Sequence, residues 1–227
     1  MSLSNIFSRR RHEGGAVEPA AGQSAVSATK ALARFVEGLS AHPHPVVLDL
    51  GGVVGANVAF FGEELGCKII VEDVATHIDG HVKGGTVDQL PAVLAERLPQ
   101  PDETVDGILC WDLFDYLDRD VATLVAARLT RVLRPGGVLF AMFSTAEPLP
   151  GSRPSYTRYV VKDAARLEYR PSEATRHRQR PLPNREIQTL FEPLRVEDQF
   201  LLKTNMREVL LRKPAVAPAG TVSPVRS

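Results

Sequence analysis

The residues best suited to bind a ligand stand directly after short apolar runs. Asp49, Gly51, Gly52 and Gly55 belong to the segment Asp49-Leu50-Gly51-Gly52-Val53-Val54-Gly55, which follows Val46-Val47-Leu48. Glycines let the backbone turn tightly and approach a ligand closely because no Cβ intervenes. In open α/β sheets, ligands bind beyond the carboxyl ends of the strands, commonly at the first strand–helix turn. This loop is therefore the first candidate binding site.

The glycine spacing distinguishes between kinds of nucleotide-binding loop. A dinucleotide-binding loop has the pattern Gly-x-Gly-x-x-Gly. If its first glycine is Gly51, the other two should stand at positions 53 and 56, but these hold Val53 and Ala56. A phosphate-binding P-loop needs a lysine after its second glycine, and Ala56 follows Gly55. The spacing disfavours an NAD-dependent oxidoreductase and a P-loop protein, and leaves the pattern Asp-x-Gly-x-x-x-Gly.

Further polar residues follow later apolar runs. Glu72 and Asp73 come after Lys68-Ile69-Ile70-Val71, Trp111 and Asp112 follow the run that starts at Val105, and Asp88 follows a weaker run. Ionised carboxylates are strong hydrogen-bond acceptors. Simpler explanations exist for each: Glu72 and Asp73 as a solvated strand end, Asp88 as a helix N-cap, and Trp111 as a core aromatic residue.

The elements that must position these residues alternate between strand and helix. Strands are predicted at 46–50, 68–71, 105–111 and 138–143, with a weaker one at 82–87, and helices at 24–39, 56–65, 89–98 and 121–133. This alternation specifies a doubly wound α/β fold, with a parallel sheet covered by helices on both faces. Runs at 195–202 and 206–211 add a C-terminal antiparallel hairpin.

Length and composition suit one intracellular domain. The 227 residues favour a single core over residues 24–213, with disordered tails at 1–23 and 214–227. Only Cys67 and Cys110 are present, so a reducing compartment fits, and the residues after the basic N-terminal cluster do not form a signal peptide. No run is long enough to span a membrane. We therefore expect a cytoplasmic protein, and we expect no metal site.

The chain resembles the class I S-adenosylmethionine-dependent methyltransferases, in particular the type 11 methyltransferase-domain proteins. The resemblance rests on several sequence segments and on their order along the chain. The likeness extends from Val46 to Lys213 and implies a mostly parallel seven-stranded sheet. The matching segments are Val47-Leu48-Asp49-Leu50-Gly51, Ile69-Ile70-Val71-Glu72-Asp73, 105–112 and Arg131-Val132-Leu133-Arg134-Pro135-Gly136-Gly137. One departure is Val53, which stands where the family usually has its middle glycine.

The resemblance implies roles for the candidate residues. Asp49 and the backbone around Gly51, Gly52 and Gly55 are expected to hold the methionine part of S-adenosyl-L-methionine. Glu72 or Asp73 is expected to bind the ribose, with Glu72 favoured. Asp88 is expected near the adenine, and Trp111 and Asp112 near the methyl donor. Trp111 also offers a π face to the sulfonium.

The sequence does not identify a catalytic base. His81, His177, Tyr156 and Asp112 have suitable chemistry, but each is also an ordinary surface or loop residue. The Asn/Asp-Pro-Pro-Tyr/Phe signature of nucleobase amino-group methylation is absent, which disfavours methylases of adenine and glutamine.

Residues 148–183 are expected to form a basic, loop-rich insertion or lid. This stretch holds eight cations (Arg153, Arg158, Lys162, Arg166, Arg170, Arg176, Arg178 and Arg180) and three acids (Asp163, Glu168 and Glu173). The excess favours an anionic small-molecule acceptor or RNA, and a solvated lid is the competing explanation. Lys plus Arg equals Asp plus Glu at 27 each overall, which argues against a general nucleic-acid-binding surface.

Two functions are compatible with these features of the sequence. The first is a methyltransferase that acts on a small-molecule acceptor, with S-adenosyl-L-methionine as cofactor. The second is a non-catalytic binding or regulatory module that keeps the fold, which the substitution at Val53 and the lack of an identifiable base favour. The acceptor and the oligomeric state stay open.

Overall fold

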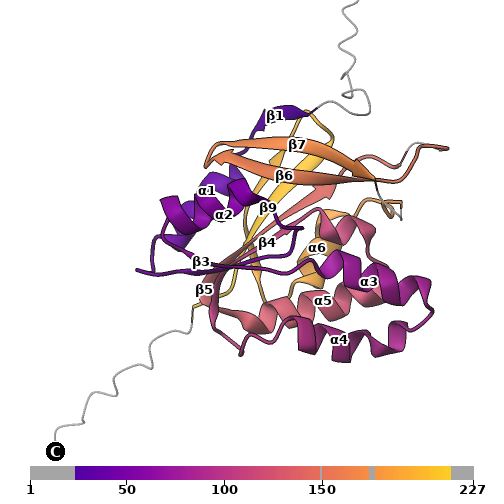
Figure 1. Ribbon diagram of the computed structural model, residues 1–227, viewed down its shortest axis with the longest axis horizontal. Helices are drawn as coiled ribbons and strands as arrows, with labels where there is room; N and C mark the ends of the chain where they lie inside the picture. The colour runs from indigo at the N-terminus through magenta and orange to yellow at the C-terminus, as the bar shows by residue number, and fades with distance from the viewer. Residues whose placement is uncertain (1–23, 149, 174–176, 216–227) are drawn as a thin grey trace, which may run out of the picture.

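A six-stranded sheet forms the centre of residues 24–148, 150–173 and 177–215, which are the residues that the computed structural model describes (Figure 1). The strand order is β3-β2-β4-β5-β9-β8. The parallel strands are β2 (Val46–Asp49), β3 (Lys68–Val71), β4 (Val105–Trp111) and β5 (Leu133–Ser144). The antiparallel hairpin of β8 (Arg195–Leu201) and β9 (Met206–Arg212) joins beside β5. The predicted doubly wound, mostly parallel α/β fold with a terminal hairpin is confirmed.

Helices cover both faces of this sheet. One face carries α3 (Val74–Lys83), α4 (Leu90–Arg97), α5 (Arg119–Val132) and α6 (Asn184–Leu190) (Figure 1). The other carries α1 (Ala31–Leu39) and α2 (Gly55–Val58), which continues into the π-helical segment η1 (Ala59–Glu64). Two short 3₁₀ segments, η2 (Val87–Gln89) and η3 (Leu113–Tyr116), follow α3 and β4. No helix in the described part of the chain is both long and apolar enough to cross a bilayer.

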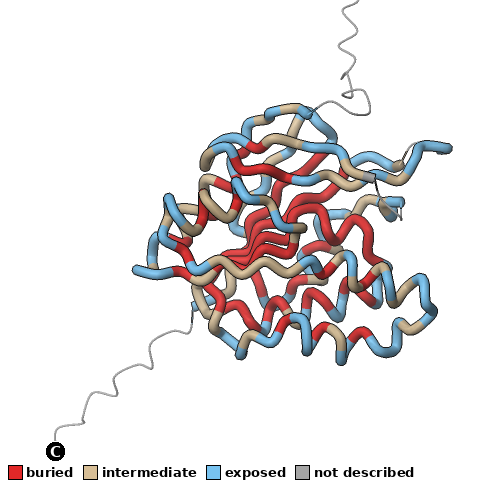
Figure 2. Tube along the Cα trace, viewed as in Figure 1, coloured by how far each residue is buried: buried red, intermediate tan, exposed pale blue. Residues whose placement is uncertain are grey.

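The sheet divides the core into two apolar layers, and its central strands are buried throughout (Figure 2). Every residue of β4 is buried. Gly107 in this strand allows α1 to pack closely, because a Cβ there would lie 2.7 Å from Phe35 Cζ and 2.6 Å from Leu39 Cδ2. The amphipathic spacing of α1 thus fixes the helix against the middle of the sheet and leaves the carboxyl ends of the strands free.

A second, antiparallel sheet lies over the same face as α1 and α2 (Figure 1). Its order is β1-β7-β6, formed by β1 (Ala25–Ala28), β6 (Ser155–Asp163) and β7 (Arg166–Glu173). Residues 148–183 were expected to be loop-rich, and instead they supply two of these strands. The predicted helix over 24–39 begins later, at Ala31, because Ala25–Ala28 pair with Arg166–Tyr169 of β7. The local pattern of apolar residues gives no sign of a pairing strand that lies so far away in the sequence.

The predicted strand at 82–87 is wrong, and the main sheet has six strands rather than seven. Helix α3 extends to Lys83, and Val82 packs as a partly buried helical residue. Gly84 and Gly85 then end the helix, with Gly85 at φ +67°. Adjacent glycines favour a turn over an extended strand. The predicted tails, 1–23 and 214–227, lie outside the described residues apart from positions 214 and 215.

Candidate cofactor site

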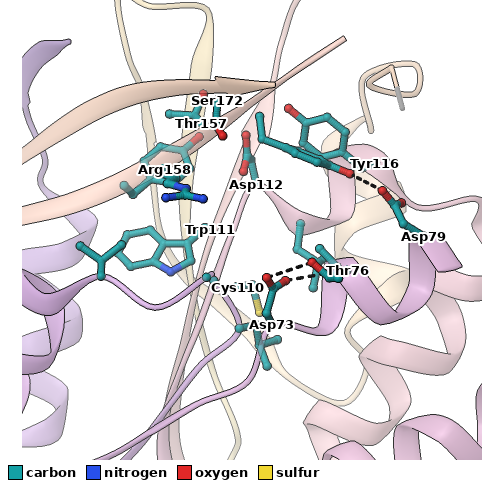
Figure 3. A pocket seen from close by; sticks show the side chains of 18 of the residues that line it. Asp73, Thr76, Asp79, Cys110, Trp111, Asp112, Tyr116, Thr157, Arg158 and Ser172 are labelled. Carbon is teal, nitrogen blue, oxygen red and sulfur yellow. Dashed lines mark hydrogen bonds between the residues drawn. The ribbon is translucent and has the colours of Figure 1, made fainter. Parts of the chain in front are cut away.

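A cavity of about 460 Å³ lies beyond the carboxyl ends of β2, β3 and β4 (Figure 3). Its floor includes Gly51, Gly52 and Asp73, its wall includes Trp111 and Asp112, and β6 covers it with residues 156–159. This is the position at which open α/β sheets bind ligands. The cavity also falls within the usual size range of small-molecule sites.

A hydrogen bond between Asp49 and Trp111 connects the glycine loop after β2 to the end of β4. Asp49 Oδ1 accepts hydrogen bonds from the Trp111 Nε1–H at 2.6 Å and from the Gly51 amide at 2.9 Å. Burial raises the pKa of the Asp49 carboxyl, and these two hydrogen bonds oppose that rise. Asp49 is only 1 % exposed and does not line the cavity. Its contacts are therefore those of a residue that shapes the loop.

Trp111 adopts an unusual backbone conformation for a large residue, with φ +49°. Its indole stacks on Tyr159 with ring centroids 5.3 Å apart and an interplanar angle of 7°, and it packs edge-on against Phe140. A Cβ at Gly51 would lie 2.9 Å from Trp111 Cδ1, so the loop passes this ring closely. Strained residues in the left-handed region concentrate at functional sites. Trp111 thus forms a fixed wall of the cavity.

The two acids after β3 have different positions. Asp73 lines the cavity and caps α3, where its side chain accepts from the Thr76 amide at 3.2 Å and the Thr76 hydroxyl at 3.0 Å (Figure 3). Glu72 does not line it and lies 3.7 Å from His77 Nε2. The sequence favoured Glu72 as the ribose ligand, whereas the geometry places Asp73 beside the loop. A Cβ at Gly52 would lie 3.7 Å from Asp73 Oδ2.

The remaining candidates lie outside the cavity. Gly55 begins α2 and has open space around it, and Asp88 is exposed in η2. Neither lines the cavity. Val53, the departure from the family's glycine pattern, is 75 % exposed and does not line the cavity either. Its side chain therefore leaves the space above the loop open.

Asp112 belongs to a buried charged cluster beside Trp111. Arg178 donates from Nη2 to Asp112 Oδ2 at 3.1 Å and from Nε to the Tyr116 hydroxyl at 3.1 Å. Burial raises the pKa of Asp112, and the charge of Arg178 opposes this rise. Tyr116 in turn donates to the Ser155 carbonyl at 2.7 Å. The cluster therefore links the end of β4 to the covering sheet.

A family comparison matches the part of this architecture that contains the cavity. Residues 48–141, less than half of the chain, match the family model described as a methyltransferase domain (Methyltransf_11). This segment contains the loop after β2, the acids after β3 and the end of β4. This segment of the chain is thus similar to a methyltransferase domain, which is consistent with a class I, Rossmann-like fold.

The chain also matches solved methyltransferase structures at low sequence identity. An S-adenosylmethionine-dependent methyltransferase from Clostridium acetobutylicum has 14 % identity and a TM-score of 0.49, covering 82 % of this chain and 89 % of that one. The 1,6-didemethyltoxoflavin-N1-methyltransferase of Burkholderia thailandensis has 20 % identity and a TM-score of 0.43, covering 81 % and 78 %. None of the curated proteins matches the chain.

Asn57, which the sequence analysis did not single out, holds the strand that covers the cavity. Its Nδ2 donates to the Tyr159 carbonyl at 3.0 Å, and its Oδ1 accepts from the Val161 amide at 2.8 Å. The side chain thus pairs with the free edge of β6 as a neighbouring strand does. Asn57 follows the glycine loop by two residues, but its partners lie about a hundred positions away, so no local signal identifies it.

The residues considered as bases are scattered around this domain. Asp112 is paired with Arg178, and Tyr156 donates its hydroxyl to Asp79 Oδ2 at 2.9 Å. His81 Nδ1 contacts the Thr86 hydroxyl at 2.8 Å and does not line the cavity. His177 lines a second cavity of about 590 Å³, which shares Tyr156, Thr157 and Tyr159 with the first. The structure thus brings Asp112 and Tyr156 together at one cavity and leaves both histidines outside it.

Proposed function

We propose that the methyltransferase domain binds S-adenosyl-L-methionine in the 460 Å³ cavity and transfers the methyl group to a small-molecule acceptor. The observation that carries this proposal is the position of Asp73 beside Gly52, facing Trp111 and Asp112 across the cavity. The bound cofactor supplies an electrophilic methyl group on a sulfonium centre.

The residues present fit this cofactor. A carboxylate offers about four acceptor sites, so Asp73 keeps capacity for ribose hydroxyls beside its contacts with Thr76. Gly52 allows the sugar to approach that carboxylate, since a Cβ there would lie only 3.7 Å from it. In this proposal Asp73 binds the ribose, Trp111 and Asp112 flank the methyl donor, and Asp49 acts through the loop.

The contribution of the chain to methyl transfer is then mainly positional. Methyl transfer is an in-line displacement, and holding the acceptor close to the methyl group on its axis supplies much of the rate. Trp111, fixed by Asp49 and Tyr159, gives this position a rigid wall. Tyr116 and Tyr156 line the same cavity, where they limit the access of water. No described residue is assigned as a base in this proposal.

The acceptor is proposed to enter from the second cavity, which shares Tyr156, Thr157 and Tyr159 with the first. The basic excess of residues 148–183 is partly used in ion pairs, for example Arg170 with Glu168 and Arg180 with Glu186. Arg153 lines the second cavity, and no ion pair joins it to another described residue. Arg153 therefore offers a guanidinium to an anionic group on the acceptor.

Isothermal titration with S-adenosylmethionine and S-adenosylhomocysteine tests the cofactor proposal. We expect both to bind, and we expect Asp73→Asn to weaken S-adenosylhomocysteine by about tenfold or more, because a charged acceptor is lost. Glu72→Gln is the matched control and should bind as the wild type does. Absence of binding to either compound, or an equal loss in the two variants, contradicts the proposal.

A non-catalytic binding module is the second candidate. It is favoured by the internal partners of the site's carboxylates, since Asp49 binds Trp111 and Asp112 binds Arg178. Cofactor binding without methyl transfer to any member of a broad acceptor panel supports the module. Release of S-adenosylhomocysteine with an acceptor supports the enzyme.

A further inference from the structure

Arg158 extends from β6 into the cofactor cavity, toward Trp111 and Asp112 (Figure 3). It is exposed, and no ion pair or hydrogen bond joins its guanidinium to another described residue. The other arginines nearby in this sheet are used differently. Arg166 lies 2.6 Å from Asp163, and Arg170 lies 2.8 Å from Glu168. Arg158 is thus a cation of the covering sheet that faces the cavity and remains available to a ligand.

One donor of the glycine loop is already paired within the loop. The Gly51 amide donates to Asp49 Oδ1 at 2.9 Å, so it is not available to a ligand. The family resemblance implies that the backbone around Gly51 and Gly52 holds the methionine part of S-adenosyl-L-methionine. With one of these amides already paired, a guanidinium above the loop adds donors for an anionic group. Guanidinium groups supply two parallel donors that match a carboxylate.

The charges that line the cavity indicate which anionic group of a ligand Arg158 would bind. If Asp73 binds the ribose, the space that remains for the amino-acid part of the cofactor is lined by Gly52, Trp111 and the overlying β6. That part carries an α-carboxylate. The acids that line the cavity are Asp73, Asp79 and Asp112, and its cations are Lys83 on α3 and Arg158 on β6. A carboxylate at the end away from α3 therefore meets repulsion unless Arg158 pairs with it.

We propose that Arg158 binds the α-carboxylate of the cofactor's methionyl group. The inference rests on the proposed function and assigns one more ligand residue to the same site. The covering sheet then contributes directly to cofactor affinity, and β6 provides a ligand that the loop after β2 lacks. An anionic group of the methyl acceptor is the competing partner for the same guanidinium.

Ligands with and without the carboxylate separate these partners. S-adenosylhomocysteine has the α-carboxylate, whereas 5′-methylthioadenosine keeps the nucleoside and the sulfur but lacks the amino-acid part. We expect Arg158→Ala to weaken S-adenosylhomocysteine by about 10-fold to 100-fold in isothermal titration, as expected for loss of a charge-assisted contact. Binding of 5′-methylthioadenosine should change by less than about twofold, which also shows that the variant is folded.

Two further variants complete the test. Arg158→Lys retains the charge without the paired donors and should restore part of the affinity for S-adenosylhomocysteine. Arg170→Ala, on the neighbouring strand, should leave both ligands unaffected. An unchanged S-adenosylhomocysteine affinity in Arg158→Ala, or equal losses for both ligands, overturns the role of Arg158 alone. If wild-type protein binds neither ligand, the proposed function itself fails.

Discussion

The indole N–H of Trp111 donates to the carboxylate of Asp49 at 2.6 Å and joins the end of β4 to the end of β2. Both residues are buried, Asp49 at 1 % and Trp111 at 5 % exposure. A buried acceptor that loses its donor costs more than the hydrogen bond itself contributes, because the group stays desolvated. This contact therefore fixes the floor and the wall of the cavity relative to each other.

Trp111→Phe should lower the free energy of unfolding by about 1–3 kcal/mol, because a smaller aromatic ring remains in place while the donor to Asp49 is lost. Urea denaturation followed by far-UV circular dichroism measures this change. In an Asp49→Asn background the same substitution should cost less, because no buried carboxylate remains. Additive losses in the double variant contradict a direct coupling between the two side chains.

Trp111 is the single tryptophan of the chain and lines the cavity, so its fluorescence should report binding. Titration with S-adenosylhomocysteine should change the intensity or position of its emission, with a midpoint that matches the calorimetric Kd. The reason is that the ligand replaces water beside the indole. Heat of binding without any change in emission places the ligand at another site.

Much of the fold is encoded in local patterns of sequence, and the site only in part. The strands that end at Asp49, Val71 and Trp111 have continuous apolar runs, so their order and the position of the cavity follow from alternation with helices. The strand predicted at 82–87 failed because two valines near Gly84 and Gly85 resemble a weak strand, although the first belongs to α3.

Contacts made across long sequence distances were not predictable. Val26 and its neighbours form a strand only because β7 pairs with them. Asn57 forms a hydrogen bond with Tyr159 of β6, which is 102 residues away in the sequence. Arg178 forms one with Asp112, which is 66 residues away. The family pattern likewise did not distinguish Glu72 from Asp73, since that choice depends on how the chain turns into α3.

Asn57→Ala should loosen the covering sheet. The change leaves the Tyr159 carbonyl and the Val161 amide without their partner, at an expected cost of about 1–3 kcal/mol. Hydrogen exchange of residues 159–163 should accelerate more than that of β4. Asn57→Asp retains the acceptor for Val161 and should give a smaller acceleration in that amide. Uniform acceleration across the domain instead indicates global destabilisation.

Arg178→Met should destabilise the domain by about 3 kcal/mol, because Asp112 is left as an unpaired buried charge. Asp112→Asn combined with Arg178→Met should cost less than Arg178→Met alone. Urea denaturation at pH 7 gives both values. Arg180→Met, which removes an exposed contact with Glu186 in the same segment, is the control and should have a far smaller effect. Equal losses in the Arg178 and Arg180 variants contradict the prediction.

The stability of the domain should fall as pH rises toward neutrality because of Asp115. Burial, followed by the charge of Asp112, raises the pKa of Asp115 to about 7, while the Ser144 amide and the charges of Arg178 and Arg207 oppose the rise. Above the unfolded pKa of about 4, the folded state holds a proton that the unfolded state has lost. The stabilisation is thus complete below about pH 4 and disappears as pH passes about 7.

Asp115→Asn isolates this effect, since the amide oxygen still accepts from the Ser144 amide but does not titrate. A pKa increase from 3.8 to about 7 corresponds to about 4 kcal/mol. The difference in unfolding free energy between variant and wild type should therefore grow in favour of the variant between pH 4 and 7, by up to about that amount, and then level off. Urea denaturation at intervals across pH 4–8 measures this difference. Parallel pH profiles for the two proteins mean that Asp115 titrates alike in the folded and unfolded chains.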